Sequence, residues 1–299
     1  MDVPIAGLRI GHWTDEAART GVTVLLFPEG TVASGEVRGG APATREFDLL
    51  EPTRTVGRLD ALVLSGGSAF GLAAADGVVD HLVEAGVGFP TGAGPVPIVV
   101  GLSLFDLMEG DGSLRPGPAE GRAAAEAAAP SQGGPMAVGR VGAGTGATVG
   151  KWRGRRYARP GGFGVAVARH AQLTVAALVA VNAAGDVGDP AVAEAVADGT
   201  FAGWPEDAEP FGVDGGGARG NTTIGAVVTD AALSKGDCRL LATSAHDGLA
   251  RAVFPAHARS DGDAFVAAAT GTVPTTGGDL DVLRVLAAAA VQRAIVRAC

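Results

Sequence analysis

Residues 220–229 read Gly220-Asn221-Thr222-Thr223-Ile224-Gly225-Ala226-Val227-Val228-Thr229. A glycine-rich run, 214–220, comes just before the polar pair at 221–222, and the chain then turns abruptly apolar. Valine, isoleucine and threonine favour β-structure because their branched side chains pack well on a pleated sheet. We therefore expect a strand over 223–229 with small residues at its centre and hydroxyl side chains where the glycine run enters it.

On both sides of this strand, β-rich and helix-prone pieces alternate along the chain. The pattern predicts one mixed α/β layered domain over residues 1–299. The stretch 186–221 carries Pro190, Pro205 and Pro210 and is expected to be a long, solvent-facing, mobile connection. The spacing between 162–169 and 173–182 predicts a hairpin. Expected strands are 8–13, 21–27, 61–64, 162–169, 173–182, 223–229 and 264–270, and expected helices are 69–85, 119–129, 236–253 and 279–298.

Composition limits both the core and the function. Glycine supplies 48 of 299 residues and aromatic residues only 5%, so the core must consist of Ala, Val and Leu in close contact. The net charge is 23 − 32 = −9 with no basic run, which argues against nucleic-acid binding. Cys238 and Cys299 lie far apart and no His-x-x-x-His occurs, so no metal is expected. No secretion signal and no apolar run of about 20 residues is present, so we expect a cytoplasmic protein that does not enter membranes.

A glycine-rich loop at 142–150 is followed by Lys151 and superficially resembles a phosphate-binding loop. That loop needs the pattern Gly-x-x-x-x-Gly-Lys-Ser/Thr, because the hydroxyl after the lysine holds magnesium. Here Thr145 stands where the first glycine is required, and Trp152 follows the lysine. The sequence therefore argues against nucleotide binding, and no cofactor is expected.

A second loop, Ser65-Gly66-Gly67-Ser68, follows an expected strand and precedes an expected helix. It differs from the Gly-x-Ser-x-Gly nucleophile elbow by having Phe70 at the last glycine. Three interpretations stay open for Ser68: a cap of the following helix, part of a substrate-contacting turn, or a nucleophile served by His246 or His257.

The junction at Thr222 suggests a different chemistry. A threonine hydroxyl is a weak nucleophile unless a base takes its proton. Cleavage before Thr222 would free an α-amine with a pKa of about 7.7–8.0, which is partly neutral near pH 7 and can serve as that base. One residue would then supply both the nucleophile and the base.

Four stretches in a fixed order carry a family resemblance: 64–72 (Leu-Ser-Gly-Gly-Ser-Ala-Phe-Gly-Leu), 220–223, 228–231 (Val-Thr-Asp-Ala) and 261–263 (Asp-Gly-Asp). Together they resemble the DmpA-like family of self-cleaving N-terminal-nucleophile hydrolases, which includes β-aminopeptidases and nylon-oligomer hydrolases. The resemblance runs from about residue 7 to the end of the chain.

The resemblance implies an αββα sandwich cut at Asn221–Thr222 into an α chain, 1–221, and a β chain, 222–299. In that family the nucleophile stands eight positions before the aspartate of the Thr-Asp-Ala turn. Asp230 therefore favours Thr222 over Thr223 as the nucleophile. The family also implies assembly of the αβ heterodimers into a homotetramer.

Site roles are carried over by position. Lys151 resembles a lysine near the nucleophile, which would keep the free amine of Thr222 neutral by repulsion between like charges. Asn182 ends an expected strand where the family places an amide donor for the oxyanion. Asp261 and Asp263 lie two residues apart, face the same way in an extended segment and would orient the amine as a coupled pair.

The sequence departs from the family at Phe105, where the family often carries a tyrosine. The missing hydroxyl removes one hydrogen bond to the substrate or oxyanion. Phe105 and the loop 65–68 (Ser-Gly-Gly-Ser) are the expected substrate contacts.

We therefore expect an autoproteolytically matured amide-bond hydrolase that uses Thr222. Its substrates would be small peptides, amino-acid amides or ω-amino-acid oligomers. Three alternatives remain: an acyltransferase of the ornithine-acetyltransferase type, a serine hydrolase using Ser68, and a non-catalytic scaffold.

Overall fold

Two β-sheets stacked face to face form the middle of the molecule. The structure is a computed structural model that describes residues 2–204 and 220–299. The first sheet has the strand order β4-β6-β5-β2-β1-β7. Its strands, in chain order, are β1 Arg9–Asp15, β2 Thr20–Leu26, β4 Thr44–Arg45, β5 Ala61–Ser65, β6 Val99–Ser103 and β7 Ala129–Pro130.

The second sheet has the order β10-β11-β13-β15-β3 and carries the 222–231 strand at its centre. Neighbouring strands in it are antiparallel except for the parallel pair β13 and β15. The strands are β3 Val32–Val37, β10 Gly162–His170, β11 Leu173–Asn182, β13 Thr222–Ala231 and β15 Ala264–Val273. Two small two-stranded ribbons pair β8 Thr148–Val149 with β9 Arg159–Pro160, and β12 Asp186–Val187 with β14 Val253–Phe254.

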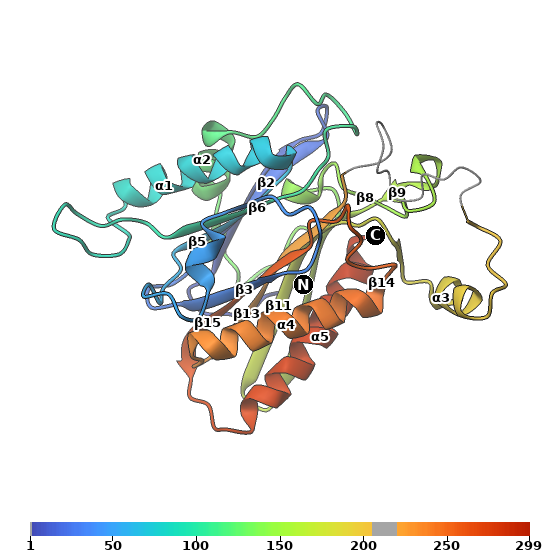
Figure 1. The fold of residues 1–299 in the computed structure, drawn as a ribbon. Coiled ribbons are helices and arrows are strands. Elements are labelled where there is room, and N and C mark those ends of the chain that lie inside the picture. The colour runs from blue at the N-terminus through green and yellow to red at the C-terminus, as the bar shows by residue number, and fades with distance from the viewer. Residues whose placement is uncertain (1, 205–219) are drawn as a thin grey trace.

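Helices cover the two outer faces (Figure 1). Helices α1 Ala74–Glu84 and α2 Pro118–Glu126 pack on the first sheet, and α4 Lys235–Ala252 and α5 Asp279–Ala298 pack on the second. The expected αββα sandwich is therefore confirmed. Helix α3, Pro190–Ala197, stands to one side of the layers. No helix in the described ranges is long and apolar enough to cross a membrane.

The alternation of side chains along β11 explains how the second sheet is covered on both faces. Ala176, Leu178 and Ala180 lie in the core between the sheets. Their neighbours at 175, 177, 179 and 181 lie in the core beneath α4 and α5. Because successive side chains of a strand point to opposite faces, a strand buried on both faces is a nearly continuous apolar run, as β11 is from Val175 to Val181.

Glycine allows the helices to lie close to the sheets. A methyl group built at Gly164 of β10 would lie 2.0 Å from the carbonyl oxygen of Ala294 in α5, and one at Gly11 of β1 would lie 2.0 Å from that of Ala124 in α2. The close packing expected from the composition is therefore confirmed at both helical layers.

The structure also corrects the sequence prediction in several places. Strands β3 and β6 were not predicted, because the short apolar runs there are interrupted by Gly35, Glu36 and Gly101. These segments are strands because they pair with β15 and β5. Helix α3 lies inside the stretch 186–221 that we expected to be a connection without regular structure; Asp189 accepts a hydrogen bond from the Ala191 N–H at its N-terminus. The glycine run at 214–219 lies outside the described residues.

Gly164→Ala should lower the free energy of unfolding by about 1–3 kcal/mol, because the added methyl group must push α5 away from β10. Urea denaturation measures the change. Gly277→Ala is the control, because no atom lies within 4 Å of a methyl group at that position, and it should leave stability unchanged within about 0.5 kcal/mol. Equal effects of the two substitutions would contradict the packing argument.

Candidate active site

Thr222 is the first residue of β13, at the end of the inter-sheet core. Ile224, Ala226 and Val228, which share its side of the strand, all belong to that core. The Thr222 side chain therefore points between the two sheets, and the residue is only 4% exposed. Asn182 is its direct partner across the antiparallel pair of β11 and β13. The packing of the sandwich thus places the hydroxyl and the amide next to each other.

The peptide bond before Thr222 is held by two donors. The Thr222 hydroxyl donates a hydrogen bond to the carbonyl oxygen of Asn221, and the Gly262 N–H donates to the same oxygen at 3.0 Å. A methyl group at Gly262 would lie 2.8 Å from the Thr222 Oγ1 atom. The glycine therefore leaves room for the hydroxyl, and its N–H is placed where negative charge would develop if this carbonyl were attacked.

Asn182 joins several parts of the site. Its Nδ2 donates to the carbonyl oxygens of Phe105, at 2.8 Å, and Gly220, at 3.1 Å. Its Oδ1 accepts from the Thr148 N–H at 2.9 Å and from the Lys151 Nζ at 2.8 Å. We expected the Asn182 amide to be an oxyanion donor. In the uncut chain it donates instead to the carbonyl of Gly220, one residue before the carbonyl of Asn221.

Lys151 is almost fully buried, with 3% of its surface exposed. Besides the Asn182 Oδ1, its Nζ donates to the main-chain carbonyls of Asn182, at 3.3 Å, and Gly220, at 3.4 Å. Burial lowers the pKa of Lys151 to about 7, although the nearby carboxylates of Glu109 and Asp261 act in the opposite direction. The ammonium group can therefore lose its proton near neutral pH.

Asp261 and Asp263 lie beside the junction, each held by two donors. Asp261 accepts from the main-chain N–H groups of Ala184, at 3.2 Å, and Ala258, at 2.8 Å. Burial, followed by repulsion from Asp263, raises the pKa of Asp261 to about 7. Asp263 accepts from the Thr223 N–H at 2.7 Å and contacts the His257 Nδ1 at 2.9 Å. The structure thus brings both aspartates to residues 221–223.

The turn 65–68 is linked to the site by hydrogen bonds to the segment that follows β6. The Asp106 carboxylate accepts from the Gly67 N–H at 2.7 Å, and the carbonyl of its neighbour Phe105 accepts from Asn182. The Phe105 ring packs on the main chain of Gly220, where a methyl group would lie 2.1 Å from a ring carbon. Phe105 therefore flanks the junction, whereas Ser65 and Gly66 are buried.

Ser68 does not cap a helix, which corrects one of the three interpretations. It begins a 3-10 segment, Ser68–Ala73, with a left-handed backbone (φ 57°), and neither that segment nor α1 has a side-chain cap. A nucleophilic role has no support either. The two histidines considered for it contact other groups: His257 contacts Asp263, and His246 contacts the Glu36 carbonyl.

Sequence reasoning missed three contributors. The Gly262 N–H lies inside the Asp-Gly-Asp triplet, of which only the carboxylates were considered. Thr148 contributes a main-chain N–H, which leaves no residue-type signal. Glu109 belongs to none of the motifs, yet its side chain is only 10% exposed and pairs with Arg155 at 2.7 Å. Within residues 2–204 and 220–299, no group of three or more His, Cys, Asp or Glu side chains is placed to hold a metal ion.

Comparisons with known sequences show the family of the chain. The profile of peptidase family S58 matches residues 1–299. An uncharacterized aminopeptidase of Mycobacterium tuberculosis (strain ATCC 25618 / H37Rv) is 44% identical over 291 residues, covering 90% of this chain and 81% of that protein. A 6-aminohexanoate-oligomer endohydrolase of Paenarthrobacter ureafaciens is 30% identical over 292 residues, covering 91% of this chain and 76% of that protein.

Solved structures show the same architecture. A Burkholderia sp. beta-aminopeptidase matches with a TM-score of 0.73 at 26% identity, over 100% of this chain and 88% of the other. The L-aminopeptidase D-Ala-esterase/amidase of Ochrobactrum anthropi, a variant of the Ntn-hydrolase fold, matches in fold with a TM-score of 0.72 at 20% identity, over 98% of this chain and 84% of the other. The chain therefore belongs to peptidase family S58 and is an aminopeptidase-family hydrolase with the N-terminal-nucleophile fold.

Proposed function

We propose that the chain cuts itself between Asn221 and Thr222 and then hydrolyses amide bonds with Thr222 as its N-terminal nucleophile. One observation carries this proposal. The Thr222 hydroxyl and the Gly262 N–H both lie on the Asn221 carbonyl oxygen, in a site from which water is largely excluded. A hydroxyl next to a carbonyl that is already polarised is the arrangement that an acyl shift requires.

In the self-cleavage step, the Thr222 Oγ1 attacks the carbonyl carbon of Asn221. The bond from this carbon to the Thr222 nitrogen breaks, and that nitrogen gains the hydroxyl proton. The product is an ester between Asn221 and Thr222 with a free amine on Thr222. Water then hydrolyses the ester, which leaves a carboxylate on Asn221 and restores the hydroxyl. The Gly262 N–H would stabilise the negatively charged oxygen during both attacks.

In the mature enzyme, the free amine of Thr222 would take the hydroxyl proton when a substrate carbonyl is attacked. Lys151 and Asp261 would set the charge around that amine, because each changes its own charge near neutral pH. Release of the new end at Asn221 would remove the Gly220 carbonyl from Asn182. The Asn182 amide could then donate to the substrate oxyanion, which is the role expected from the sequence.

The relatives support a substrate class of small amides. Proteins named as aminopeptidases and as 6-aminohexanoate-oligomer endohydrolases match this chain along most of its length. We propose small peptides, amino-acid amides or ω-amino-acid oligomers as substrates. A cytoplasmic location remains a prediction.

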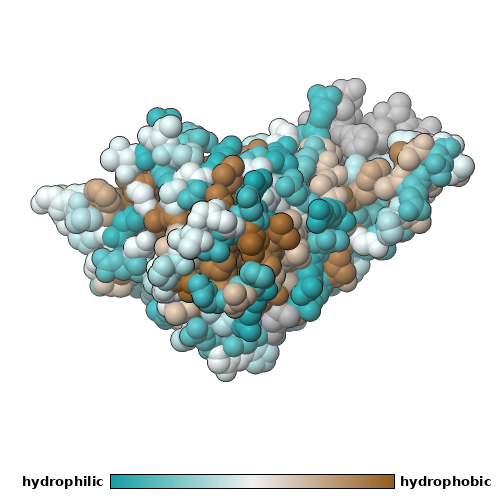
Figure 2. All heavy atoms as spheres, turned by 90° about the horizontal axis from the view of Figure 1, so that it is seen from below, coloured by the Kyte–Doolittle hydropathy of each residue, from teal (hydrophilic) through white to brown (hydrophobic). Residues whose placement is uncertain are grey.

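A homotetramer of αβ heterodimers also remains a proposal. Figure 2 looks onto the side of the molecule where α4 and α5 lie, and apolar residues gather near its centre. Val285 and Val296 of α5 are 70% and 49% exposed. A helix with apolar residues on its outer as well as its inner face is typical of one covered by a further layer of protein.

Thr222→Ala should give a single uncut chain without amidase activity, because it lacks the attacking oxygen. Intact mass spectrometry should show the unsubstituted protein as two chains, residues 1–221 and 222–299. Activity is measured with amino-acid p-nitroanilides and 6-aminohexanoate oligomers. Thr223→Ala is the matched control and should still be cut before residue 222. A Thr222→Ala protein that is cut at the same bond would rule the proposal out.

Gly262→Ala should slow self-cleavage by about tenfold or more, because the methyl group would displace the Thr222 hydroxyl from the Asn221 carbonyl. The rate is followed by quantifying the 222–299 chain over time. Gly277→Ala, with open space around it, should be cut at the unsubstituted rate. Cleavage of the Gly262→Ala protein at the unsubstituted rate would contradict the argument that the missing side chain at residue 262 leaves space for the Thr222 hydroxyl.

Removing Lys151 should change how stability depends on pH. The folded protein holds this pKa at about 7, below its unfolded value of about 10.4, so the unfolded state binds more protons between these limits. In an uncut Thr222→Ala background, the free energy of unfolding should therefore rise from pH 7 to 10 relative to the same protein carrying Lys151→Met. The difference should grow by at most about 1.4 kcal/mol per pH unit and be flat below pH 6. Denaturant titrations measure it; a difference that stays constant from pH 6 to 10 would refute the assignment.

A further inference from the structure

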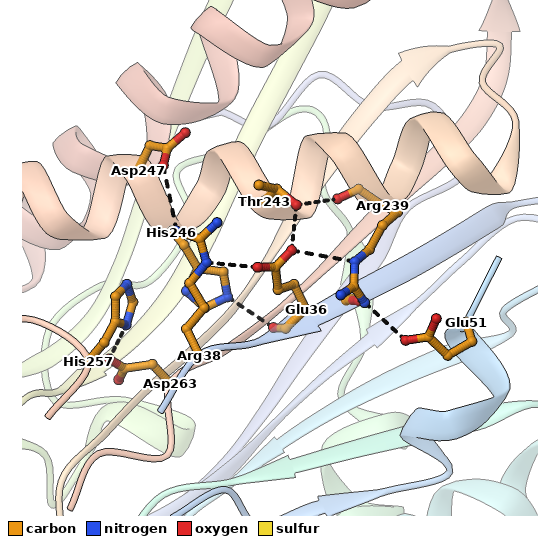
Figure 3. Close-up of polar contacts among 10 residues, drawn as sticks. Glu36, Arg38, Glu51, Arg239, Thr243, His246, Asp247, His257 and Asp263 are labelled. Atoms are coloured by element: carbon orange, nitrogen blue, oxygen red, sulfur yellow. Dashed lines mark hydrogen bonds and ion pairs between the residues drawn. The ribbon is translucent and has the colours of Figure 1, made fainter. Parts of the chain in front are cut away.

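A histidine outside the expected catalytic set holds one of the site carboxylates. The His257 Nδ1 lies 2.9 Å from one oxygen of Asp263 (Figure 3). The other oxygen accepts the Thr223 N–H at 2.7 Å. We propose that His257 is a positioning residue, which fixes Asp263 and, through it, the peptide that follows the nucleophile Thr222. This inference rests on the proposed function of Thr222.

The Asp263 carboxylate accepts a main-chain hydrogen bond that a carbonyl oxygen would accept in a regular sheet. The regular pairing of β13 with β15 begins at Ile224 and Ala264, and an isolated bridge joins Asn221 to Asp261. Between the bridge and the ladder, the Thr223 N–H finds the Asp263 carboxylate instead of a carbonyl oxygen. The direction of this carboxylate therefore sets the orientation of the peptide bond between Thr222 and Thr223, and with it the position of the nucleophile.

His257 can hold that direction only through a hydrogen bond with a defined donor. An ionised carboxylate only accepts hydrogen bonds, so the imidazole proton must be on Nδ1. The His257 side chain is 19% exposed and that of Asp263 is 2% exposed, so little water is present to replace this contact. Asp263 thus has one donor from the main chain next to the nucleophile and one from His257.

His257 is itself held from the helical layer. The ring of His246, on α4, packs against the His257 ring with centroids 5.0 Å apart, and its Nε2 donates to the Glu36 carbonyl at 3.0 Å. The side chain of Glu36 on β3 in turn contacts Arg38, Arg239 and Thr243 (Figure 3). These contacts join α4 to β3 and hold the His246 ring in place against the His257 ring.

The backbone at His257 suggests matched variants. Its φ of 56° is left-handed, a conformation that asparagine and glycine both tolerate. The asparagine amide can donate from nearly the same place as Nδ1, whereas glycine removes the donor without adding backbone strain. His257→Asn and His257→Gly therefore differ mainly in the hydrogen bond to Asp263.

The test is the rate of self-cleavage of freshly synthesised chains in cell-free translation, read from the appearance of the 222–299 chain. His257→Gly should be cut about tenfold or more slowly, because small displacements of reacting groups are costly. His257→Asn should restore the rate to within about threefold of the unsubstituted chain. His170→Gly, which removes an exposed histidine outside this network, should be cut at the normal rate.

Thermal unfolding of the same variants in the Thr222→Ala background checks that each is folded. If His257→Gly does not fold, His257→Ala replaces it, because alanine also removes the donor and adds no charge beside Asp263. Equal rates for the variant without a donor and for His257→Asn, or a normal rate for the former, would overturn the inference. Cleavage in Thr222→Ala alone would instead refute the proposed function, so the two failures are distinguishable.

Discussion

The alignment of residues 221–223 with residues 261–263 is the constraint on which the candidate site depends. The Gly262 N–H holds the Asn221 carbonyl, and the Asp263 carboxylate holds the Thr223 N–H. Thr222 lies between these two contacts, so neither the carbonyl before it nor the peptide after it can rotate freely. Because β13 and β15 are adjacent and parallel, the two segments meet at the same end of the sheet although they are separated by an entire helix.

Burial gives this arrangement its chemical character. A lysine and an aspartate that are fully charged in water at pH 7 here have pKa values of about 7, because both lie in the protein interior. Such groups cost stability, which other parts of the fold must offset. Lys151 contacts carbonyl oxygens and an amide oxygen, and Asp261 accepts two main-chain N–H groups. The polar site is thus supported mainly by backbone groups, at the end of β11 and in the segments that follow it and precede Asp261.

The helical layer under the second sheet also contributes to the site. His246 on α4 packs against His257, which contacts Asp263 beside the nucleophile. Substitutions on α4 can therefore affect chemistry at the end of β13 without touching it. In the same way, Phe105 belongs to the segment after β6 of the first sheet, yet it packs on Gly220. Both sheets and one helical layer converge on the same peptide bond.

Much of the molecule could be predicted from the sequence. Apolar strands such as β11 and β13, the hairpin of β10 and β11, and helix α5 follow from local composition and periodicity. The ordered motifs indicated the family, the fold and the set Thr222, Asn182, Lys151, Asp261 and Asp263. Strands β3 and β6 could not be predicted, because their short, interrupted runs become strands only when a neighbour supplies hydrogen-bond partners. The same holds for the contribution of Gly262, whose main-chain N–H is common to nearly all residues.

The amino-acid sequence alone thus determined which side chains are available and where the long strands β11 and β13 and the helices α4 and α5 lie, since these depend on interactions between near neighbours in the chain. Only the tertiary structure decided that the Asn182 amide lies on the Gly220 carbonyl, that the Gly262 N–H lies on the Asn221 carbonyl, and that His257 faces Asp263 rather than Ser68. These contacts join groups far apart in sequence, so their geometry depends on how the sheets and helices pack and is not encoded in any local pattern.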